Sequence, residues 1–412
     1  MIILKCPEIR FKNDDGNNYP NWEDKKLDNV FKFYKGKGIS KIELSEEGIP
    51  CIIYGELYTK YREVIGVVKS KTNIKKELLF MSEIGDILIP SSGETQKDIA
   101  TASTVMEKNV ALGGDINILR SKETINSPYV SYYLKHIKNI EISKLSQGNS
   151  VVHLYSKQLS NLKIEIPSLE EQQKIGDFFM LLDKRIEQQE QKIALLKDYK
   201  KAMMQKIFSQ KIRFKDDNGN DYPDWEEKKL GEIGVFYRGH SYKATDVSSE
   251  GLLVLRSNNI SNDSITLSTG LQYVTKKCNN EIILENNDIV ICMANGSKNL
   301  VGKSGIFHKK NEFQTVTAGA FCSIYRAQNS LSRYLFQTDK YKKYLSILFS
   351  GTNINNLKNS DLEELKFKLP KRAEEKRIFL LFQKLDINIE KQEGILENLK
   401  NQKEVLLQKM FI

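Results

Sequence analysis

The amino-acid sequence predicts an α+β protein in which two mixed α/β domains alternate with two long helices, and the helices pack together as an antiparallel coiled coil. Three observations support this class. The chain repeats itself at an offset of 203 residues, each copy ends in a long heptad-patterned segment, and the remainder of each copy alternates short β-rich runs with turns. The length of 412 residues also exceeds the usual size of one hydrophobic core.

The two copies open with the same segment. Residues 8–36 read EIRFKNDDGNNYPNWEDKKLDNVFKFYKG, and residues 211–239 read KIRFKDDNGNDYPDWEEKKLGEIGVFYRG, so that Trp22 matches Trp225. The cluster of Asp, Asn and Gly is typical of a turn. We interpret the Tyr-Pro-x-Trp that follows as an aromatic plug that packs this loop onto the domain; stacking on nucleic acid is the alternative.

The middle of each copy diverges from the other. Residues 37–146 and 240–349 share only scattered anchors, such as a buried strand after a turn at 85–89 and 287–291. Other expected elements are β-rich runs at 50–54, 110–112 and 252–255 and helices at 128–138 and 332–348. The pattern therefore predicts one fold made twice with different surfaces.

The copies converge again where Gly148 matches Gly351. Strands expected at 162–167 and 365–370 lead into the long helices. Ser168 and Glu171 have the spacing of a capping box at the start of the first helix, whereas the second copy has lysine at the cap position. We place the two domains at 1–167 and 211–370, and the two helical segments at 168–210 and 371–412.

Both long segments carry a coiled-coil seam. Apolar residues recur in alternating steps of four and three over 169–207 and again over 372–410, and the polar breaks fall at equivalent positions. Equivalent environments for both copies require the helices to run antiparallel and hold the domains apart, over about 60 Å at ~1.5 Å per residue. Gln189 and Gln392 lie near the helix midpoints, so we expect them to face each other and fix the register.

Charge and composition narrow the class of partner. The formal net charge is +10, and the long helices are nearly balanced, so about +7 lies outside them. This favours nucleic acid over a membrane. Five cysteines without a CxxC pair favour buried thiols over a zinc site, and the absence of a membrane-length apolar run or signal peptide predicts a cytoplasmic protein.

The sequence offers no catalytic constellation. The four histidines, His136, His153, His240 and His308, fall in unrelated contexts, and methyltransferase motifs are missing. Residues 296–304 imitate a P-loop, but five residues separate the glycines where the phosphate cradle needs four. We therefore expect neither catalysis nor a cofactor or metal on this chain.

Several loops combine small residues with hydrogen-bond donors. Residues 90–97 and 293–303 follow equivalent buried strands, and such loops allow close approach to phosphates and base edges; a mobile turn is the alternative. With neighbouring basic and aromatic clusters, the candidate DNA-contacting residues of the first copy are Tyr34, Lys35, Lys37, Tyr58, Lys60, Arg62, Ser91, Ser92, Gly93, Thr95 and Lys97. Those of the second copy are Tyr237, Arg238, Tyr242, Lys243, Arg256, Asn258, Asn259, Asn295, Ser297, Lys298 and Lys303.

The whole layout resembles the specificity subunit of type I restriction-modification systems. The resemblance rests on two dissimilar regions, each followed by a helix of the kind EEQQKIGDFFMLLDKRIEQQEQKI or EEKRIFLLFQKLDINIEKQEGIL, and on the phrases at 48–58, 87–95 and 113–115. It implies a non-catalytic, DNA-binding subunit whose target-recognition domains each read one half of a split, asymmetric DNA sequence, while the helices set the spacing.

The resemblance also implies partners. Two methyltransferase subunits would methylate adenine N6 with S-adenosylmethionine, and restriction subunits would add ATP-dependent, Mg-dependent cleavage, so that the cofactors belong to the partner subunits. A coiled-coil scaffold whose paired domains bind protein is the alternative, and an enzyme acting alone is a third reading that lacks its motifs.

Overall fold

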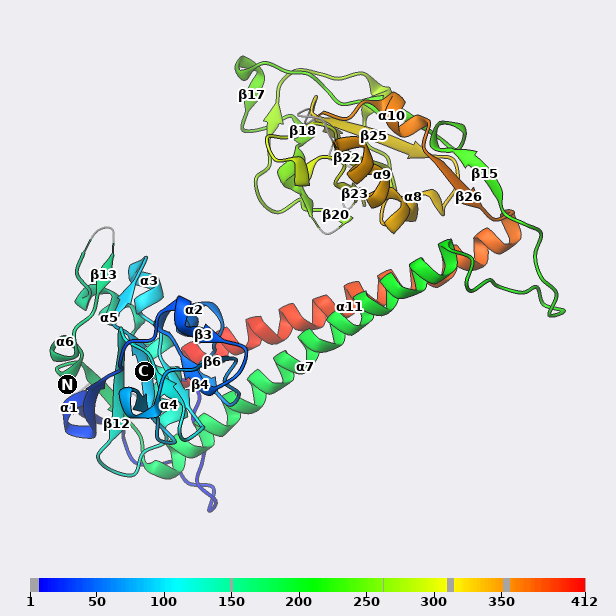
Figure 1. Ribbon diagram of the computed structural model, residues 1–412. Coiled ribbons are helices and arrows are strands. Elements are labelled where there is room, and N and C mark those ends of the chain that lie inside the picture. Colours follow the sequence, from blue (N-terminus) through cyan, green and yellow to red (C-terminus); the bar gives the residue numbers. More distant parts are fainter. Residues whose placement is uncertain (1–6, 149–150, 262, 310–314, 351–355, 412) are drawn as a thin grey trace. The chain divides into compact units, whose positions relative to one another are not determined.

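The computed structural model describes residues 7–148, 151–261, 263–309, 315–350 and 356–411. It divides into two compact units, and each unit contains part of both long helices. Unit 1 comprises Met1–Lys192 with Gln392–Ile412, and unit 2 comprises Ile193–Lys391. The predicted α+β class, with a duplicated domain and two paired long helices, is confirmed (Figure 1). The domain boundaries inferred from the sequence stay a prediction.

Unit 1 is built on a sheet with the strand order β2-β12-β8-β10-β5, in which only the β10–β5 pair among these neighbours is parallel. Its strands are β2 (Phe31–Lys35), β12 (Ile116–Ser121), β8 (Ile87–Pro90), β10 (Ser103–Val105) and β5 (Val64–Ile65). A second sheet has the order β3-β6-β4-β11-β7, formed by β3 (Leu44–Ser45), β6 (Ser70–Thr72), β4 (Ile49–Ile52), β11 (Ala111–Leu112) and β7 (Phe80–Met81).

Small ladders and short helices complete the globular part of unit 1. The ladders are β1 (Glu23–Lys26) with β14 (Lys163–Ile166), and β9 (Ser92–Gly93) with β13 (Val152–His153). The helices are α1 (Leu27–Val30), α2 (Tyr54–Thr59), α3 (Gln96–Ile99), α4 (Ser127–His136), α5 (Asn139–Leu145) and α6 (Ser156–Ser160), with 3-10 turns at η1 (Lys41–Glu43) and η2 (Lys76–Leu78).

Unit 2 repeats the order of the first four strands of that main sheet, as β16-β25-β22-β23, and extends it with β20 and β19. These strands are β16 (Gly234–Arg238), β25 (Cys322–Ala327), β22 (Ile289–Cys292), β23 (Ser304–Ile306), β20 (Asp263–Ile265) and β19 (Ile260–Ser261). The second sheet, β17-β21-β18-β24, contains β17 (Val247–Ser248), β21 (Tyr273–Val274), β18 (Leu252–Leu255) and β24 (Val316–Ala318).

Some of the remaining elements of unit 2 correspond to elements of unit 1. A ladder joins β15 (Glu226–Lys229) to β26 (Lys366–Leu369), as β1 joins β14. The helices are α8 (Ser332–Leu335), α9 (Asp339–Phe349) and α10 (Asn359–Glu363), and the 3-10 turns are η3 (Leu230–Glu232), η4 (Ala244–Asp246), η5 (Ser257–Asn259), η6 (Asn280–Ile282) and η7 (Lys298–Leu300). The strands expected after turns and before the long helices are confirmed.

One expected helix is two helices in the structure. The predicted helix at 332–348 divides into α8 and α9, because Thr338 adopts an extended conformation and its side chain accepts a hydrogen bond from the Tyr341 amide. The first-copy helix expected at 128–138 likewise ends at His136, and α5 follows it. The predicted helix at 332–348 ran through the break between α8 and α9, whereas the predicted helix at 128–138 stopped before α5, which was not predicted.

The long helices are α7 (Leu169–Phe208) and α11 (Arg372–Met410), in agreement with the predicted ranges. Within unit 1, Phe179 stacks on Phe411, and the Lys403 ammonium lies 2.7 Å from the Asp183 carboxylate. Gln189 donates a hydrogen bond of 3.0 Å to the side-chain oxygen of Gln392. As the residue number rises along α7, the residue number of the contact partner falls from 411 to 403 to 392. The two helices therefore run antiparallel, and the predicted antiparallel packing and facing glutamines are confirmed.

The aromatic plug is structural in both units. The Trp22 indole donates to Glu171 at 3.2 Å, and the Trp225 indole donates to Glu374 at 2.9 Å. Arg10 and Arg213 donate to the same two carboxylates. The expected capping box is only half formed: the Glu171 amide bonds the Ser168 hydroxyl, but the Glu171 carboxylate turns to Arg10 and Trp22.

Candidate nucleic-acid interface

The loop after β8 is held by its own side chains. Thr95 caps α3 by accepting a hydrogen bond from the Asp98 amide at 3.1 Å, and the Asp98 carboxylate accepts from the Thr95 amide at 3.0 Å. Thr95 and Lys97 are exposed, whereas Ser91, Ser92 and Gly93 are buried. The loop therefore presents a polar rim that its own hydrogen bonds hold in place.

The helix α2 brings a further candidate to this loop. It packs against β8 and β9, and it carries Tyr58. Burial, the neighbouring Tyr54 hydroxyl and the negative charges of Asp98 and Glu94 raise the pKa of Tyr58. Unit 1 thus brings Tyr58 together with the 91–97 loop. Lys60 is exposed, but its ammonium is bound to Glu56 at 2.5 Å.

The loop after β22 joins two candidate clusters of unit 2. The Asn295 carboxamide accepts from the Ser297 amide and donates to the Ser257 hydroxyl, each at 3.0 Å. Ser257 begins η5, which follows Arg256 and contains Asn258 and Asn259. Asn258, Ser297 and Lys298 are exposed, while Asn259 is buried and holds the turn. Lys303 is half-buried before β23.

Two of the candidate tyrosines belong to a framework that both units share. The Arg120 guanidinium lies 5.3 Å from the Tyr34 ring centre and donates to Asp86; Arg326 lies 5.3 Å from the Tyr237 ring centre and donates to Asp288. Identical packing in both units fits a scaffold better than a sequence-reading contact. Tyr242 similarly packs in a small apolar cluster with Leu252, Val254 and Val274.

The other basic candidates divide into two groups. Lys35, Lys37, Arg238 and Lys243 have exposed side chains at the ends of β2 and β16 or just beyond them. Arg62 instead pairs with the long helix α7, at 2.7 Å from Glu190 and 3.6 Å from Asp183. The Arg62 charge is therefore neutralised by two carboxylates of α7, where the globular part of unit 1 contacts the long helices.

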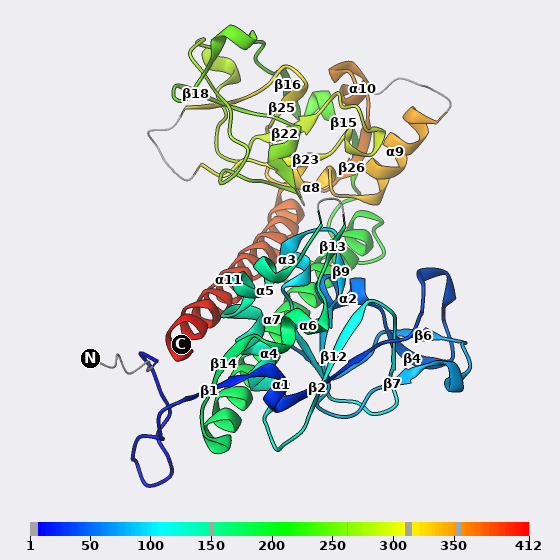
Figure 2. The same ribbon diagram turned by 90° about the vertical axis from the view of Figure 1, so that its left-hand side faces the viewer.

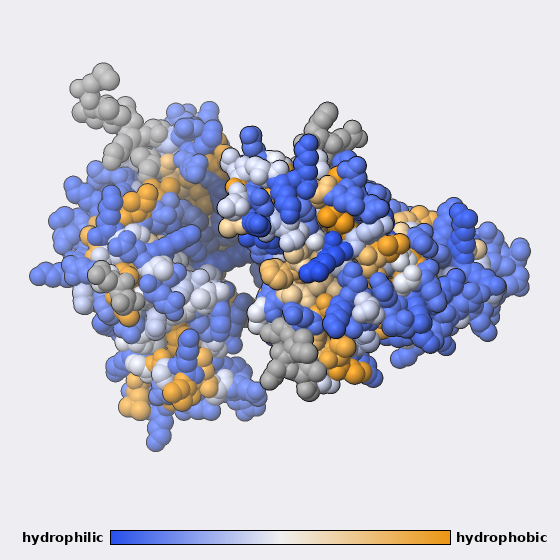
Figure 3. Space-filling model, turned by 90° about the horizontal axis from the view of Figure 1, so that it is seen from above, coloured by the Kyte–Doolittle hydropathy of each residue, from blue (hydrophilic) through white to orange (hydrophobic). Residues whose placement is uncertain are grey.

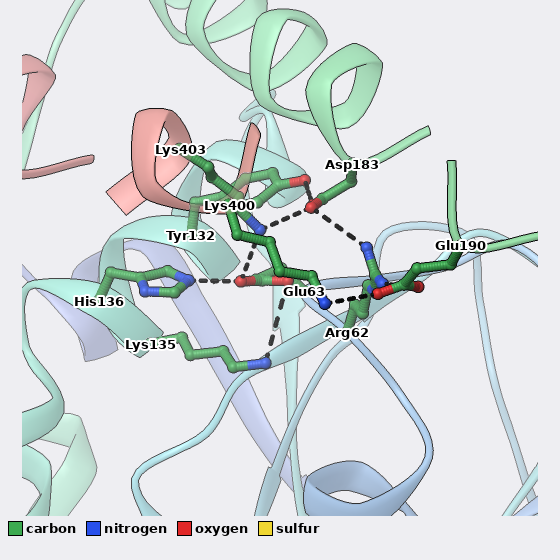
Figure 4. Close-up of polar contacts among 9 residues, drawn as sticks. All are labelled: Arg62, Glu63, Tyr132, Lys135, His136, Asp183, Glu190, Lys400 and Lys403. Atoms are coloured by element: carbon green, nitrogen blue, oxygen red, sulfur yellow. Dashed lines mark hydrogen bonds and ion pairs between the residues drawn. The ribbon is translucent and has the colours of Figure 1, made fainter. Parts of the chain in front are cut away.

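Figure 4 shows the polar cluster that anchors unit 1 to both long helices. Lys403 of α11 lies 2.7 Å from Asp183 of α7 and 3.2 Å from the buried Glu63, which precedes β5. His136 also bonds Glu63. Burial alone would raise the pKa of Glu63, but the hydrogen bond from His136 and the charges of Lys135 and Lys403 hold that pKa well below its ordinary value. Burial lowers the pKa of Lys135.

Unit 2 contains the same anchor in simpler form. Lys200 of α7 lies 2.7 Å from Asp386 of α11, and the Tyr334 hydroxyl donates to Asp386 at 2.7 Å. Lys200 also lies over the Tyr334 ring at 5.3 Å, as Lys403 lies over Tyr132 at 5.2 Å. The lysines that interrupt the seam pattern are thus ion-paired, which explains their presence at equivalent positions.

The surface, the possible metal ligands, the helix hydropathy and the cysteines further narrow the kind of site that the described residues can form. In the face drawn in Figure 3, hydrophilic residues cover most of the surface and apolar residues form separate patches. The described residues contain no group of three or more His, Cys, Asp or Glu side chains that could hold a metal ion. Across the same residues, every helix falls short of the length and apolarity needed to cross a membrane. Cys51, Cys292 and Cys322 are buried thiols, Cys278 is half-buried, and Cys6 lies outside the described residues.

The sequence reasoning missed one polar contact beside the first loop. His153 in β13 pairs with Ser92 in β9, and its Nδ1 atom lies 3.1 Å from the Ser92 hydroxyl. The two residues are 61 positions apart in the chain, so inspecting each histidine's local context could not reveal the pair. The repeat was the available signal, because residue 153 falls in the segment where the two copies converge.

The structure contains a duplicated α/β unit. Each copy has a polar loop after its central strand, and the two long helices pair with each other. This layout defines a class of two-domain recognition proteins. The family model for the type I restriction modification DNA specificity domain matches residues 19–198 and again residues 222–401. The chain belongs to the family of type I restriction-modification specificity subunits.

Individual relatives agree with this assignment. The specificity subunit of the type I restriction enzyme MjaVIII from Methanocaldococcus jannaschii is 25% identical over 407 residues, which cover 95% of this chain and 92% of that protein. The StySPI specificity subunit from Salmonella potsdam is 32% identical over 171 residues, or 39% of this chain and 35% of that protein.

Solved structures show the same fold. A crystal structure of the S subunit of a type I restriction-modification system from M. genitalium superposes with a TM-score of 0.63 at 17% identity, and the match covers 99% of both chains. A second match, from a study of assembly and conformational transition of the type I system, has a TM-score of 0.53 at 17% identity and covers 96% of this chain and 98% of that one.

Proposed function

We propose that this chain is the DNA-reading subunit of a type I restriction-modification complex, and that each unit reads one half of a bipartite, asymmetric duplex target. One observation carries the proposal: both units share the framework of Arg120 or Arg326, of Trp22 or Trp225, and of the long helices, while their loops differ. A shared scaffold with divergent polar loops suits two readers of different half-sites.

The basic surface supports DNA as the ligand. Most of the net charge of +10 lies outside the two nearly balanced long helices. Lys35, Lys37, Lys97 and Lys243 are all exposed, so they could contact phosphates, and Lys298 is exposed as well. Exposed lysines would supply affinity and salt dependence, and the polar loops would supply sequence preference.

The partner subunits would dock on the long helices away from the seam. Exposed apolar side chains occur there in both units, including Leu181, Ile395 and Val405 in unit 1 and Leu195 and Ile387 in unit 2. Exposed apolar side chains do not stabilise the helix pair itself, and such side chains are typical of surfaces that bind another protein. These positions therefore suit a protein partner. We propose two methyltransferase subunits there, with restriction subunits joining the assembled complex.

In this proposal the present chain is non-catalytic and acts in the cytoplasm. Methyl transfer from S-adenosylmethionine to adenine N6 would occur on the methyltransferase subunits. Cleavage with ATP and Mg would occur on the restriction subunits. The chain supplies the address, because it places those subunits on one DNA sequence.

Single-molecule sequencing of methylated adenines tests the proposal. The chain and its methyltransferase partner would be expressed in a host that lacks adenine methylation. We expect one bipartite motif, and replacing residues 37–146 with the corresponding region of another family member should change one half-site only. Methylation that is absent, or that follows no bipartite motif, would contradict the proposal. Specific retention of motif DNA that is lost in Lys298→Ala separates it from a protein-binding scaffold.

A further inference from the structure

The segment before α6 lies against the loop that follows β8, and the same arrangement recurs in unit 2. In unit 1, β13 pairs with β9, and the Leu154 amide donates to the Ser91 carbonyl at 3.0 Å (Figure 2). In unit 2, Asn356 bridges Ala294, and the Leu357 amide donates to the Met293 carbonyl at 2.7 Å. Both segments therefore form a second polar edge beside a candidate DNA-contacting loop.

The backbone of this edge is constant while its side chains change. Leu154 and Leu357 are both buried and occupy equivalent positions, 203 residues apart. The residue after each leucine is extended and caps a short helix: the Tyr155 amide donates to Gln158 at 3.0 Å, and the Lys358 amide donates to Asp361 at 2.9 Å.

The exposed side chains on either side of the leucine differ in chemistry. Unit 1 places His153 and Tyr155 there, and unit 2 places Asn356 and Lys358; all four are exposed. Packing does not explain this divergence, because the side chains face solvent. The backbone framework does not explain it either, because the amides of Leu154 and Leu357 make equivalent hydrogen bonds in the two units. Variation confined to exposed positions on a fixed backbone is the pattern expected of a reader.

The side chains present suitable recognition groups. The bond to Ser92 and stacking on Tyr155, with ring centres 6.4 Å apart, orient the His153 ring. Because that bond uses Nδ1, the exposed ring keeps Nε2 as a second atom that could recognise a base. Asparagine can bond adenine N6 and N7 together in the major groove. The Ser91 hydroxyl on the same ladder is buried and unpartnered within the described part of the chain.

We propose that His153 and Asn356 contact base edges and determine one base-pair preference each, His153 in one half-site and Asn356 in the other. Tyr155 and Lys358 flank these contacts. The proposal rests on the proposed function, because it assigns further reading residues to the same DNA-binding units. It adds positions outside the diverged regions 37–146 and 240–349, so exchanging those regions alone would leave both residues in place.

The test uses the full chain with its methyltransferase partner. His153→Ala and Asn356→Ala would be compared with the wild type by sequencing methylated adenines across a host genome. Binding to duplexes carrying the wild-type motif would also be measured at several salt concentrations. Lys157→Ala and Ser360→Ala are matched controls, since both residues are exposed, lie 203 residues apart and follow the same leucines on α6 and α10.

We expect His153→Ala to relax one position of one half-site and Asn356→Ala one position of the other. Discrimination there should fall about 10- to 100-fold, with an unchanged salt slope. The control variants should retain the wild-type motif. An unchanged motif in both alanine variants would overturn the proposal. So would uniform weakening on all sequences with a reduced salt slope, because that marks a phosphate contact. A wild-type complex without a bipartite motif would instead sink the proposed function itself.

Discussion

At the scale of single residues, Glu63 is a buried ionisable group with several charged neighbours in unit 1. It is almost fully buried, and Lys403, Lys135 and His136 surround its carboxylate. Because these partners hold its pKa below the ordinary 4.5, the ionised form stabilises the folded unit. The Glu63 charge is thus one of the charges that hold the globular part to both helices.

This dependence predicts acid sensitivity. The folded pKa lies below the unfolded value of 4.5, so the stabilisation is complete above pH 4.5 and is lost progressively as the pH falls below it. Glu63→Gln should cost about 3 kcal/mol at pH 7, because it removes the carboxylate that pairs with Lys135 and one of the two carboxylates that pair with Lys403. Thermal unfolding from pH 7 to pH 3 would measure this.

The control is Glu190→Gln, which removes a half-exposed partner of Arg62 and Lys400. Exposed pairs contribute about 0–1 kcal/mol, so that variant should unfold close to the wild type. The deficit of Glu63→Gln should shrink toward pH 3. A deficit that stays constant across the pH range would assign the loss to altered packing instead of charge.

At the scale of elements, the seam glutamines are the point where the two helices recognise each other. Gln189 donates to the side chain of Gln392 and also to its backbone carbonyl at 2.9 Å. A hydrogen bond between equivalent polar residues is satisfied in one alignment of the helices. Neighbouring apolar positions would tolerate a shift by a heptad more readily, so the pair selects the register.

Replacing both glutamines with leucine should therefore raise thermal stability by a few degrees while loosening the register. The gain comes from apolar burial, and the loss is the aligned hydrogen bond. Thermal unfolding would measure stability, and disulfide trapping between cysteines introduced at seam positions would measure alternative alignments. The Gln189→Leu single variant is the comparison, because it removes the hydrogen bond between the two carboxamides and keeps Gln392. A double variant that unfolds earlier than the wild type would contradict this account.

Local patterns were sufficient for the helices and most strands. Heptad spacing gave α11 its observed bounds, and the run before each long helix gave β14 and β26. The α8–α9 break was missed because one extended residue, Thr338, interrupts an otherwise helical pattern. The partner of Glu171 was missed because Arg10 lies 161 residues away. Pairings among two-residue strands are also long-range, so the order of the sheets could not be read from the sequence.

The candidate site was predictable to a similar degree. The loops at 91–97 and 295–298 were found from composition, and the structure ties Tyr58 to the first and Ser257 to the second. Arg62 and Tyr34 looked like exposed basic and aromatic candidates, yet one pairs with α7 and the other supports Arg120. Composition alone does not distinguish a reading residue from a structural one, because both require polar groups next to the same strands.

At the scale of the whole molecule, the proposed spacer role of the helices can be tested by insertion. Four residues added to α7 lengthen it by about 6 Å, near two base pairs at ~3.4 Å each. They also change the heptad phase. We expect sequencing of methylated adenines to show a changed spacer between unchanged half-sites. Four residues inserted in the turn at 13–18 are the control and should leave the spacer as it was. A changed half-site would defeat the idea.

Unit 1 combines residues from both ends of the chain, and this has a consequence for the order in which the two units fold. Phe411, which directly follows α11, packs against Trp22, Tyr129, Tyr133 and Phe179, so the core of the first unit includes a residue from beyond the second long helix. A ribosome makes all of 193–391 before it makes Phe411. The second unit is one continuous segment, so it can finish folding before the first unit receives Phe411. During translation, the core of unit 1 is thus completed only after Phe411 has been made. A chain that terminates before Phe411 would therefore be defective in the unit that was translated first.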